Sequence, residues 1–212
     1  SNLTMISDKV TGARKDLLTS PVRRSSLAIA YFCASLLSTL IISYVTTAAG
    51  LVYLAFTGWY LSFGDVLLII LDVFLLTSFG VALSSVINAF LSTSAQASAV
   101  GTIVSAGYGF VCGAYMPISQ FGEGLRNFLG FLPGTYGTSI IRNHALAGVF
   151  REMSAQNFPA EAIEGIKDSV DCNLYFFGAK VSEAAAYGVL VGSVLLLIGA
   201  FVLINVLRKK RS

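Results

Sequence analysis

Long apolar stretches without a single charged residue dominate the chain. No Asp, Glu, Lys or Arg occurs in residues 25–64, 73–122 or 184–207. Each stretch is at least as long as the ~20 residues that an α-helix needs to cross a bilayer. A soluble domain of this size could not bury so much apolar surface in one core. The pattern therefore predicts a polytopic membrane protein and excludes a soluble enzyme.

The breaks between the apolar stretches predict an all-α fold with four transmembrane helices. We expect these helices at about residues 27–56, 65–89, 99–115 and 184–207. The first is longer than a bilayer requires, so it should tilt, kink or protrude, with Gly50 as the expected break. Residues 1–25 would precede the helices as a cytoplasmic segment.

Residues 117–148 interrupt the apolar pattern. They are only moderately apolar, and Pro133 divides them into halves that are too short to cross a membrane. Irregular backbone at membrane depth is tolerated where protein or water covers it. The stretch therefore predicts a re-entrant helical hairpin that enters from the outside. Residues 149–183 would then form a small extracytoplasmic insert, with a helix beginning at Pro159.

The placement of charge predicts the topology. The chain is 55% hydrophobic and 12% charged, with mean hydropathy +0.77 and net charge +3. Basic residues gather in residues 1–24 and 208–211, whereas residues 149–183 are acidic. Lys and Arg are enriched on cytoplasmic flanks, so we expect both ends inside a bacterial cell membrane. Basic ends beside membrane spans indicate lipid as a partner, and nucleic acid is not expected.

Enzyme chemistry finds little support in the sequence. The single histidine, His144, excludes a zinc motif of the H-E-x-x-H kind, and no serine-nucleophile motif or P-loop occurs. A serine–histidine pair that uses His144 stays open. We expect no metal, cofactor or catalytic residue in this chain, and any ATP and Mg²⁺ would bind a separate ATPase chain.

Asp72 is the carboxylate deepest within an expected span. Counting forward in fours gives Leu76, Gly80, Ser84 and Asn88, which predicts a partly polar helix face. Ionisable residues inside membranes are functional-site candidates. The alternative is that Asp72 lies near the outer interface and pairs with an outer Arg or Lys.

Small residues recur every four positions in two of the expected spans. In lipid, this spacing lets helix backbones approach closely. The stripes predict helix packing, with a lining of the transport pathway as the alternative. Their members are Gly101, Ser105, Gly109 and Gly113 in the third span, and Gly188 and Gly192 in the last.

Short motifs occur in a particular order along the chain. They are DKVTG at residues 8–12 with LLTSPV at 17–22, GAYMPI at 113–118, and LPGTY at 132–136 followed by Arg142. Together they resemble the type-2 ABC exporter permeases, which export drugs, polysaccharides and teichoic acids. Permeases of that family have six spans per half, so this chain would supply the last four.

The resemblance implies a permease half that moves an amphipathic drug, a lipid-linked molecule or a peptide-like substrate. Two halves, identical or different, would pair and carry two cytoplasmic ATP-binding subunits. A coupling helix would dock on the ATPase; its residues are Asp8, Lys9, Gly12, Arg14, Lys15, Asp16, Leu17 and Leu18. The hairpin would form an outer gate; its residues are Pro117, Glu123, Arg126, Pro133, Tyr136 and Arg142.

Two other functions remain alternatives. An ion-coupled secondary transporter or channel would use broken helices near the midplane with acidic ion sites. Here the break lies at the outer edge without an acidic cluster. A membrane sensor would use the insert at residues 149–183 to recognise a peptide or an antibiotic.

Overall fold

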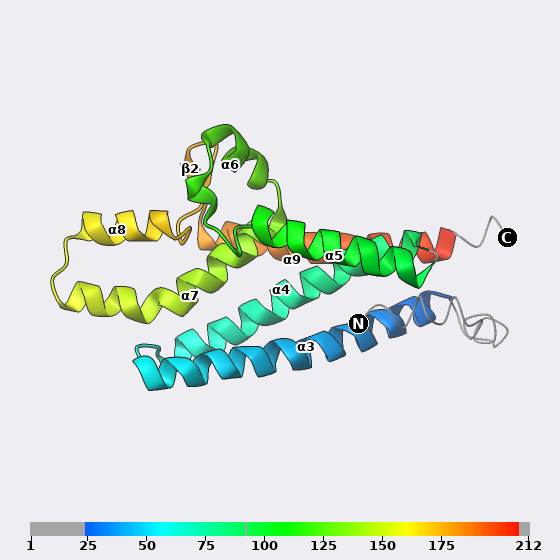
Figure 1. The fold of residues 1–212 in the computed structure, drawn as a ribbon, viewed down its shortest axis with the longest axis horizontal. Coiled ribbons are helices and arrows are strands. Elements are labelled where there is room, and N and C mark those ends of the chain that lie inside the picture. The colour runs from blue at the N-terminus through cyan, green and yellow to red at the C-terminus, as the bar shows by residue number, and fades with distance from the viewer. Residues whose placement is uncertain (1–23, 92, 208–212) are drawn as a thin grey trace.

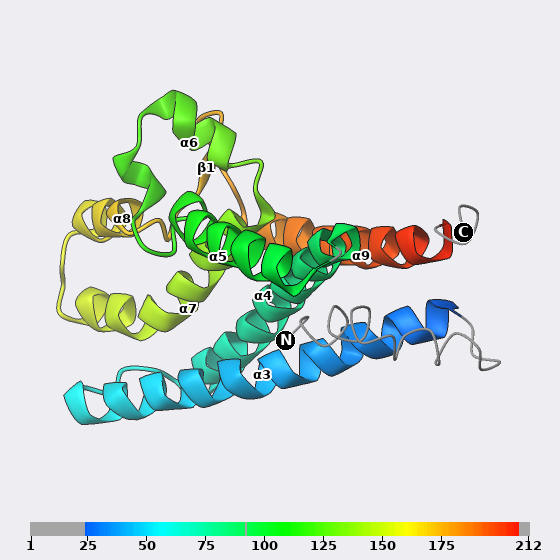
Figure 2. The same cartoon turned by 45° about the vertical axis from the view of Figure 1, so that its right-hand side comes forward.

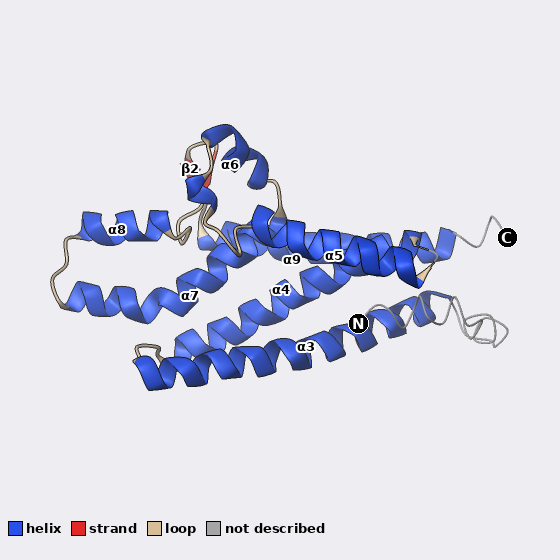
Figure 3. Ribbon diagram, in the orientation of Figure 1, coloured by secondary structure: helices blue, strands red, loops and turns tan. Residues whose placement is uncertain are grey.

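The computed structural model describes residues 24–91 and 93–207. The expected coupling helix at residues 8–18 lies outside these residues. The described chain is mainly helical, with one short pair of strands (Figure 3).

Three helices of the described part are long and apolar enough to cross a membrane. They are α3 (Arg24–Thr57), α4 (Phe63–Phe90) and α9 (Glu183–Leu207). At 1.5 Å per residue, α3 is about 51 Å long, so it exceeds the thickness of a bilayer core as expected. The predicted break at Gly50 is wrong, because α3 continues through it without interruption.

Helix α5 (Ser94–Val111) occupies the region of the expected third span but begins and ends earlier. The Thr93 hydroxyl accepts a hydrogen bond from the Gln96 amide and caps its start. The helix is rich in Ala, Ser and Gly and is less apolar than the three long helices. The four-crossing count therefore stays a prediction.

The stretch after α5 is broken at Pro133, as predicted. A 3₁₀ turn (η1, Ile118–Gln120) and α6 (Glu123–Leu129) precede the break, and Pro133 is the first residue of α7 (Pro133–Ala155). Pro suits this position because its missing N–H would have no partner there. Helix α7 runs seven residues beyond the expected boundary at Gly148. Whether this hairpin re-enters the membrane stays a prediction.

The segment between α7 and α9, residues 156–182, is called the cap here. It contains α8 (Ala160–Ser169), which begins directly after Pro159 as expected. A two-stranded antiparallel hairpin follows, in which β1 (Tyr175–Phe176) pairs with β2 (Ala179–Lys180). These strands were not predicted.

Helix α4 is the central helix, in contact with α3, α7 and α9. The start of α3 and the end of α9 lie at the same end of the molecule, and α8 lies towards the other end (Figures 1 and 2). One core cluster joins α3, α4 and α9; its buried residues are Ala28, Phe32, Val81, Ala82, Ala89 and Phe201. Ala97 is the one residue of α5 that is buried in the described structure.

Candidate functional site

A groove of about 450 Å³ lies between α4 and α5 and is closed at one end by the start of α7. The predicted polar face of α4 and the small-residue stripe of α5 line it together. Asn88, Gly101, Ser105 and Gly109 are all lining residues. Two helix faces that the sequence singled out separately therefore meet in one space.

Three other stripe glycines do not join this groove. Gly113 lies after the end of α5 with φ +76°, a left-handed conformation that favours glycine. It belongs to a turn, so its assignment to the helical stripe is wrong. Gly188 and Gly192 have open space where a Cβ would stand, so they pack against nothing in the described chain.

A chain of hydrogen-bonding groups joins α4, α7 and α9. The Asp72 Oδ2 atom lies 2.6 Å from His144 Nδ1, and the Tyr187 hydroxyl donates to Asp72 Oδ1 over 2.5 Å. On the other side of the ring, His144 Nε2 lies 3.1 Å from Glu183 Oε1. Asp72 is only 2% exposed, so its carboxylate depends on these partners.

This arrangement changes two of the sequence-based interpretations. Asp72 pairs with His144 and Tyr187, and not with an outer Arg or Lys. Both ring nitrogens of His144 face carboxylate oxygens, so neither faces a serine hydroxyl. In the described part of the chain, no group of three or more His, Cys, Asp or Glu residues is placed to hold a metal ion.

Arg142 joins α7 to the turn after α5 and to the cap. Its guanidinium donates to the Gly113 carbonyl, to the Val170 carbonyl at 3.3 Å and to Asp171 Oδ2 at 3.3 Å. Asp171 also accepts the backbone N–H groups of Ile118 and, at 2.9 Å, of Ser119. The buried Asp171 thus fastens the 113–119 turn to the cap.

The remaining gate residues surround the break in the hairpin. The Tyr136 hydroxyl donates to the Gly130 carbonyl at 2.6 Å, and burial raises the Tyr136 pKa. Pro117 precedes η1, while Glu123 is exposed at the start of α6. Arg126 Nε is buried without a hydrogen-bond partner among the described residues. Among the gate residues, Arg142 forms an ion pair with Asp171 of the cap.

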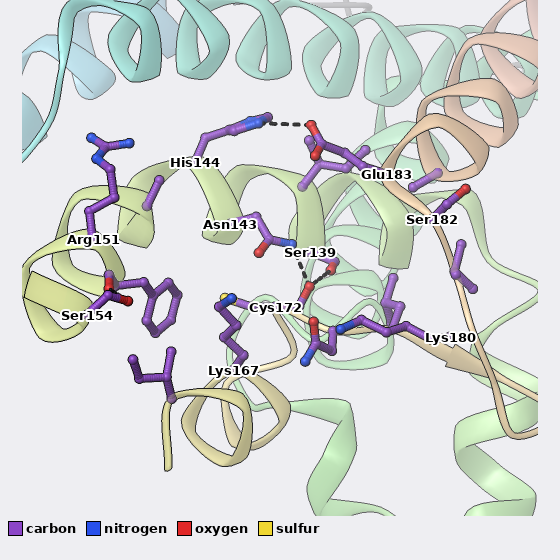
Figure 4. Close-up of a pocket in the computed structure, with 18 residues that line it drawn as sticks. Ser139, Asn143, His144, Arg151, Ser154, Lys167, Cys172, Lys180, Ser182 and Glu183 are labelled. Carbon is purple, nitrogen blue, oxygen red and sulfur yellow. Dashed lines mark hydrogen bonds and ion pairs between the residues drawn. The ribbon is translucent and has the colours of Figure 1, made fainter. Parts of the chain in front are cut away.

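A cleft of about 800 Å³ separates α7 from the cap and the start of α9; it is called the cap cleft here. Figure 4 shows His144 and Glu183 facing each other at one side, with Lys167 and Lys180 extending into the space between α7 and the cap. Apolar side chains line the rest of the cleft. They are Ile140, Ala147, Phe150, Ile163, Leu174, Val181 and Ala186.

Two lysines of the cap cleft share one carboxylate. Lys167 Nζ and Lys180 Nζ each lie 3.1 Å from an oxygen of Glu164. These ammonium groups lower the Glu164 pKa to about 2. Arg151, at another edge of the cleft, pairs with Asp65 on α4. The cationic side chains of the cleft are therefore held in place by ion pairs.

Asp171, Tyr187 and Glu183 were not predicted as site residues from the sequence. Asp171 and Glu183 counted only towards the acidic charge of the insert, and Tyr187 lies one helical turn after Glu183. A signal for Glu183 was available, because it is the last charge before an apolar span. Asp171 has φ 56°, a left-handed conformation that Asp tolerates, but the residue type alone does not predict this conformation.

A family model described as ABC-2 type transporter matches residues 1–145, which is 145 of the 212 residues. The chain belongs to the ABC-2 type transporter family. The resemblance of the short motifs is thereby confirmed, and this permease is a multi-pass membrane component of an ABC transporter. No curated protein and no solved structure matches the chain. The match ends inside α7, so the cap and α9 of the permease lie beyond it.

Proposed function

We propose that this permease is one half of an ATP-driven exporter for an amphipathic cargo such as a drug, a lipid-linked molecule or a peptide-like compound. Two halves, identical or different, pair in a bacterial cell membrane and carry two cytoplasmic ATP-binding subunits. ATP and Mg²⁺ bind those subunits. The family membership and the α4–α5 groove together support this function.

The lining of the groove suits an amphipathic cargo. Leu76, Phe79 and Leu83 give it apolar walls, while Ser105 and Tyr108 place hydroxyl groups beside them. Ligand sites commonly combine a mainly apolar wall with a few polar groups that orient the ligand. Because α5 buries little of its own surface, a second permease half can complete the groove from the other side.

The long helices would transmit the conformational change of the ATPase subunits from one end of the permease to the other. The coupling segment at residues 8–18 lies shortly before α3 in the sequence, and α3 packs against α4 and α9. ATP-driven closure of the ATPase subunits pushes the coupling segment, and α3 transmits the push as a rigid rod. Alternating access follows when α4 moves relative to α5 and changes the width of the groove.

Two neighbouring substitutions on α5 test the groove. Ser105→Phe fills it, while Ala106→Phe adds the same ring at a position that does not line it. In proteoliposomes that contain the permease and its ATPase, we expect Ser105→Phe to lower cargo-stimulated ATP hydrolysis at least about tenfold, and Ala106→Phe to keep it. Equal activities would remove the groove from the pathway.

The coupling segment is tested separately. Substitution of Gly12, Leu17 and Leu18 is expected to abolish cargo-stimulated ATP hydrolysis while the permease still inserts into the membrane. Normal coupling in these variants would contradict the role of residues 8–18.

A membrane sensor is the second candidate, and the cap cleft is the observation in its favour. Its volume of about 800 Å³ is within the range of small-molecule sites. Lys167→Gln together with Lys180→Gln changes the cleft without touching the groove. Loss of a signalling response with unchanged transport would favour the sensor function. Unchanged signalling would rule out this role for the cleft and favour the exporter function.

A further inference from the structure

We propose that Asp72, His144 and Glu183 form a proton-binding latch, in which one proton taken up from the cap cleft holds α7 against the start of α9. His144 is the middle member, with Asp72 Oδ2 at 2.6 Å from Nδ1 and Glu183 Oε1 at 3.1 Å from Nε2. The latch goes beyond the exporter function, because it needs neither the cargo nor the ATPase.

His144 can donate a hydrogen bond to both Asp72 and Glu183 only when its ring carries an added proton. A neutral imidazole carries one N–H, so it can donate to only one of two carboxylates. The other nitrogen would then present a lone pair to a carboxylate oxygen. Asp72 already accepts a hydrogen bond from Tyr187, as an ionised carboxylate does. Both contacts of His144 become hydrogen bonds when the ring holds two N–H groups.

The ionisable groups around His144 come from α4, α7, α8, β2 and α9. Asp72 comes from α4, and Glu183 and Tyr187 come from α9. Lysines of α8 and β2 line the same cleft, but both pair with Glu164; Arg151 of α7 pairs with Asp65. Two carboxylates therefore contact the ring directly, while each nearby cation contacts a carboxylate of its own.

The cap cleft gives the proton its route. Glu183 has a side chain that is 58% exposed, whereas that of His144 is 8% exposed and that of Asp72 is 2% exposed. His144 and Glu183 both line the cleft, and Asp72 lies behind them in the bundle. A proton thus passes between bulk water and the ring on the Glu183 side. That this side is outside the cell rests on the proposed topology.

Loss of the proton opens the latch. The ring then turns a lone pair towards Glu183, which is exposed enough to move into water, and the proton leaves to solvent. The start of α9 loses its link to α7 while Asp72 keeps its link to the remaining N–H. Helix α7 also borders the α4–α5 groove through Gly134 and Thr138. An alkaline exterior therefore releases the start of α9 from the helix that closes one end of that groove.

His144 is the only histidine of the chain, so its protonation can be read without overlap. The full chain is labelled with ¹⁵N-histidine, placed in lipid nanodiscs and followed by NMR from pH 5 to pH 9. We expect two N–H groups at the acidic end and the loss of the Nε2 proton as the pH rises. A single N–H across the whole range would overturn the latch.

Glu183→Gln tests the contribution of the exposed partner. It leaves the packed core intact, because the Glu183 side chain lies mostly in water. We expect this variant to lose the Nε2 proton at a lower pH than the unchanged protein, because it lacks the carboxylate that accepts from Nε2. The matched control is Glu161→Gln, an exposed carboxylate of the cap outside the cleft lining. An unchanged titration in Glu183→Gln would overturn the proposal.

Hydrogen exchange at a fixed pH of 6 supplies the mechanical readout. Glu183→Gln should speed exchange in the first turns of α9 severalfold, and Glu161→Gln should leave it unchanged. Equal exchange in both variants would show that the contact does not hold α9. None of these measurements involves ATP hydrolysis, so failure of the exporter function and failure of the latch are distinguishable.

Discussion

Arg151, near the end of α7, forms a two-pronged ion pair with Asp65, in the first turn of α4. Its Nη1 lies 3.0 Å from Asp65 Oδ1, and Nη2 contacts Oδ2. Asp65 also closes a capping box with Ser62 at the start of α4. One carboxylate therefore fixes both the beginning of α4 and the position of α7 beside it.

Replacing Arg151 by Ala should leave the Asp65 carboxylate buried with only Ser62 as its partner. An uncompensated buried charge is destabilising, so we expect the unfolding temperature in detergent to fall by a few degrees. Arg151→Lys should fall less, because a single ammonium retains the charge but loses the forked geometry. Equal stability of Arg151→Ala and the unchanged permease would contradict a structural role for the pair.

Gly148 lets α7 approach the loop between α3 and α4. A Cβ at this position would clash with the Tyr60 carbonyl oxygen, so the two backbones would have to separate. Gly148→Ala is expected to destabilise the permease by about 1–3 kcal/mol, as overpacking does.

Gly165 on α8 is the matched control for Gly148. A Cβ there meets nothing within 4 Å, so Gly165→Ala should stabilise its helix by about 0.5–1 kcal/mol. Thermal unfolding of the two variants in the same detergent checks both signs. Similar shifts in both would show that the contact with Tyr60 does not limit the position of α7.

Asp171 should be sensitive even to a change that keeps its shape. Asp171→Asn preserves the size of the side chain and tolerates the left-handed backbone, but it cannot accept from Ile118, Ser119 and Arg142 at once. We expect a loss of about 2–4 kcal/mol and faster hydrogen exchange in residues 113–121. Unchanged exchange in that turn would show that Asp171 does not fasten it.

The Cys172 thiol should resist alkylation. It is buried, and burial raises its pKa to about 11, so about one thiol in a thousand is ionised at pH 8. A cysteine introduced at the exposed Ala179 should react at least tenfold faster in the same molecule. Mass spectrometry of the two sites gives both rates, and comparable rates would contradict the packing of the cap.

The local features of this fold follow from sequence pattern, and the long-range contacts do not. Charge-free runs located α4 and α9, and Pro133 marked the start of α7, because apolar length and proline act within a few residues. The prediction of a break at Gly50 was wrong because a long helix tolerates a single glycine when the residues around it maintain the backbone hydrogen bonds of the helix.

The candidate site was predictable only in part, for the same reason. Positions four apart placed Asn88 and Ser105 on helix faces, and both faces line the groove. Asp72, His144 and Glu183 are separated by 72 and 39 positions along the chain, and no spacing rule brings them together. Only the packing of α4, α7 and α9 places them side by side.

Purification of the permease from its native membrane tests the central claim most directly. The sample is analysed by mass spectrometry for a co-purifying chain with a P-loop and is assayed for ATP hydrolysis. We predict that an ATP-binding subunit accompanies the permease in equal amount and that substitution of Gly12, Leu17 and Leu18 removes it or its cargo stimulation. A permease that moves cargo across liposomes without such a subunit and without ATP would contradict the account.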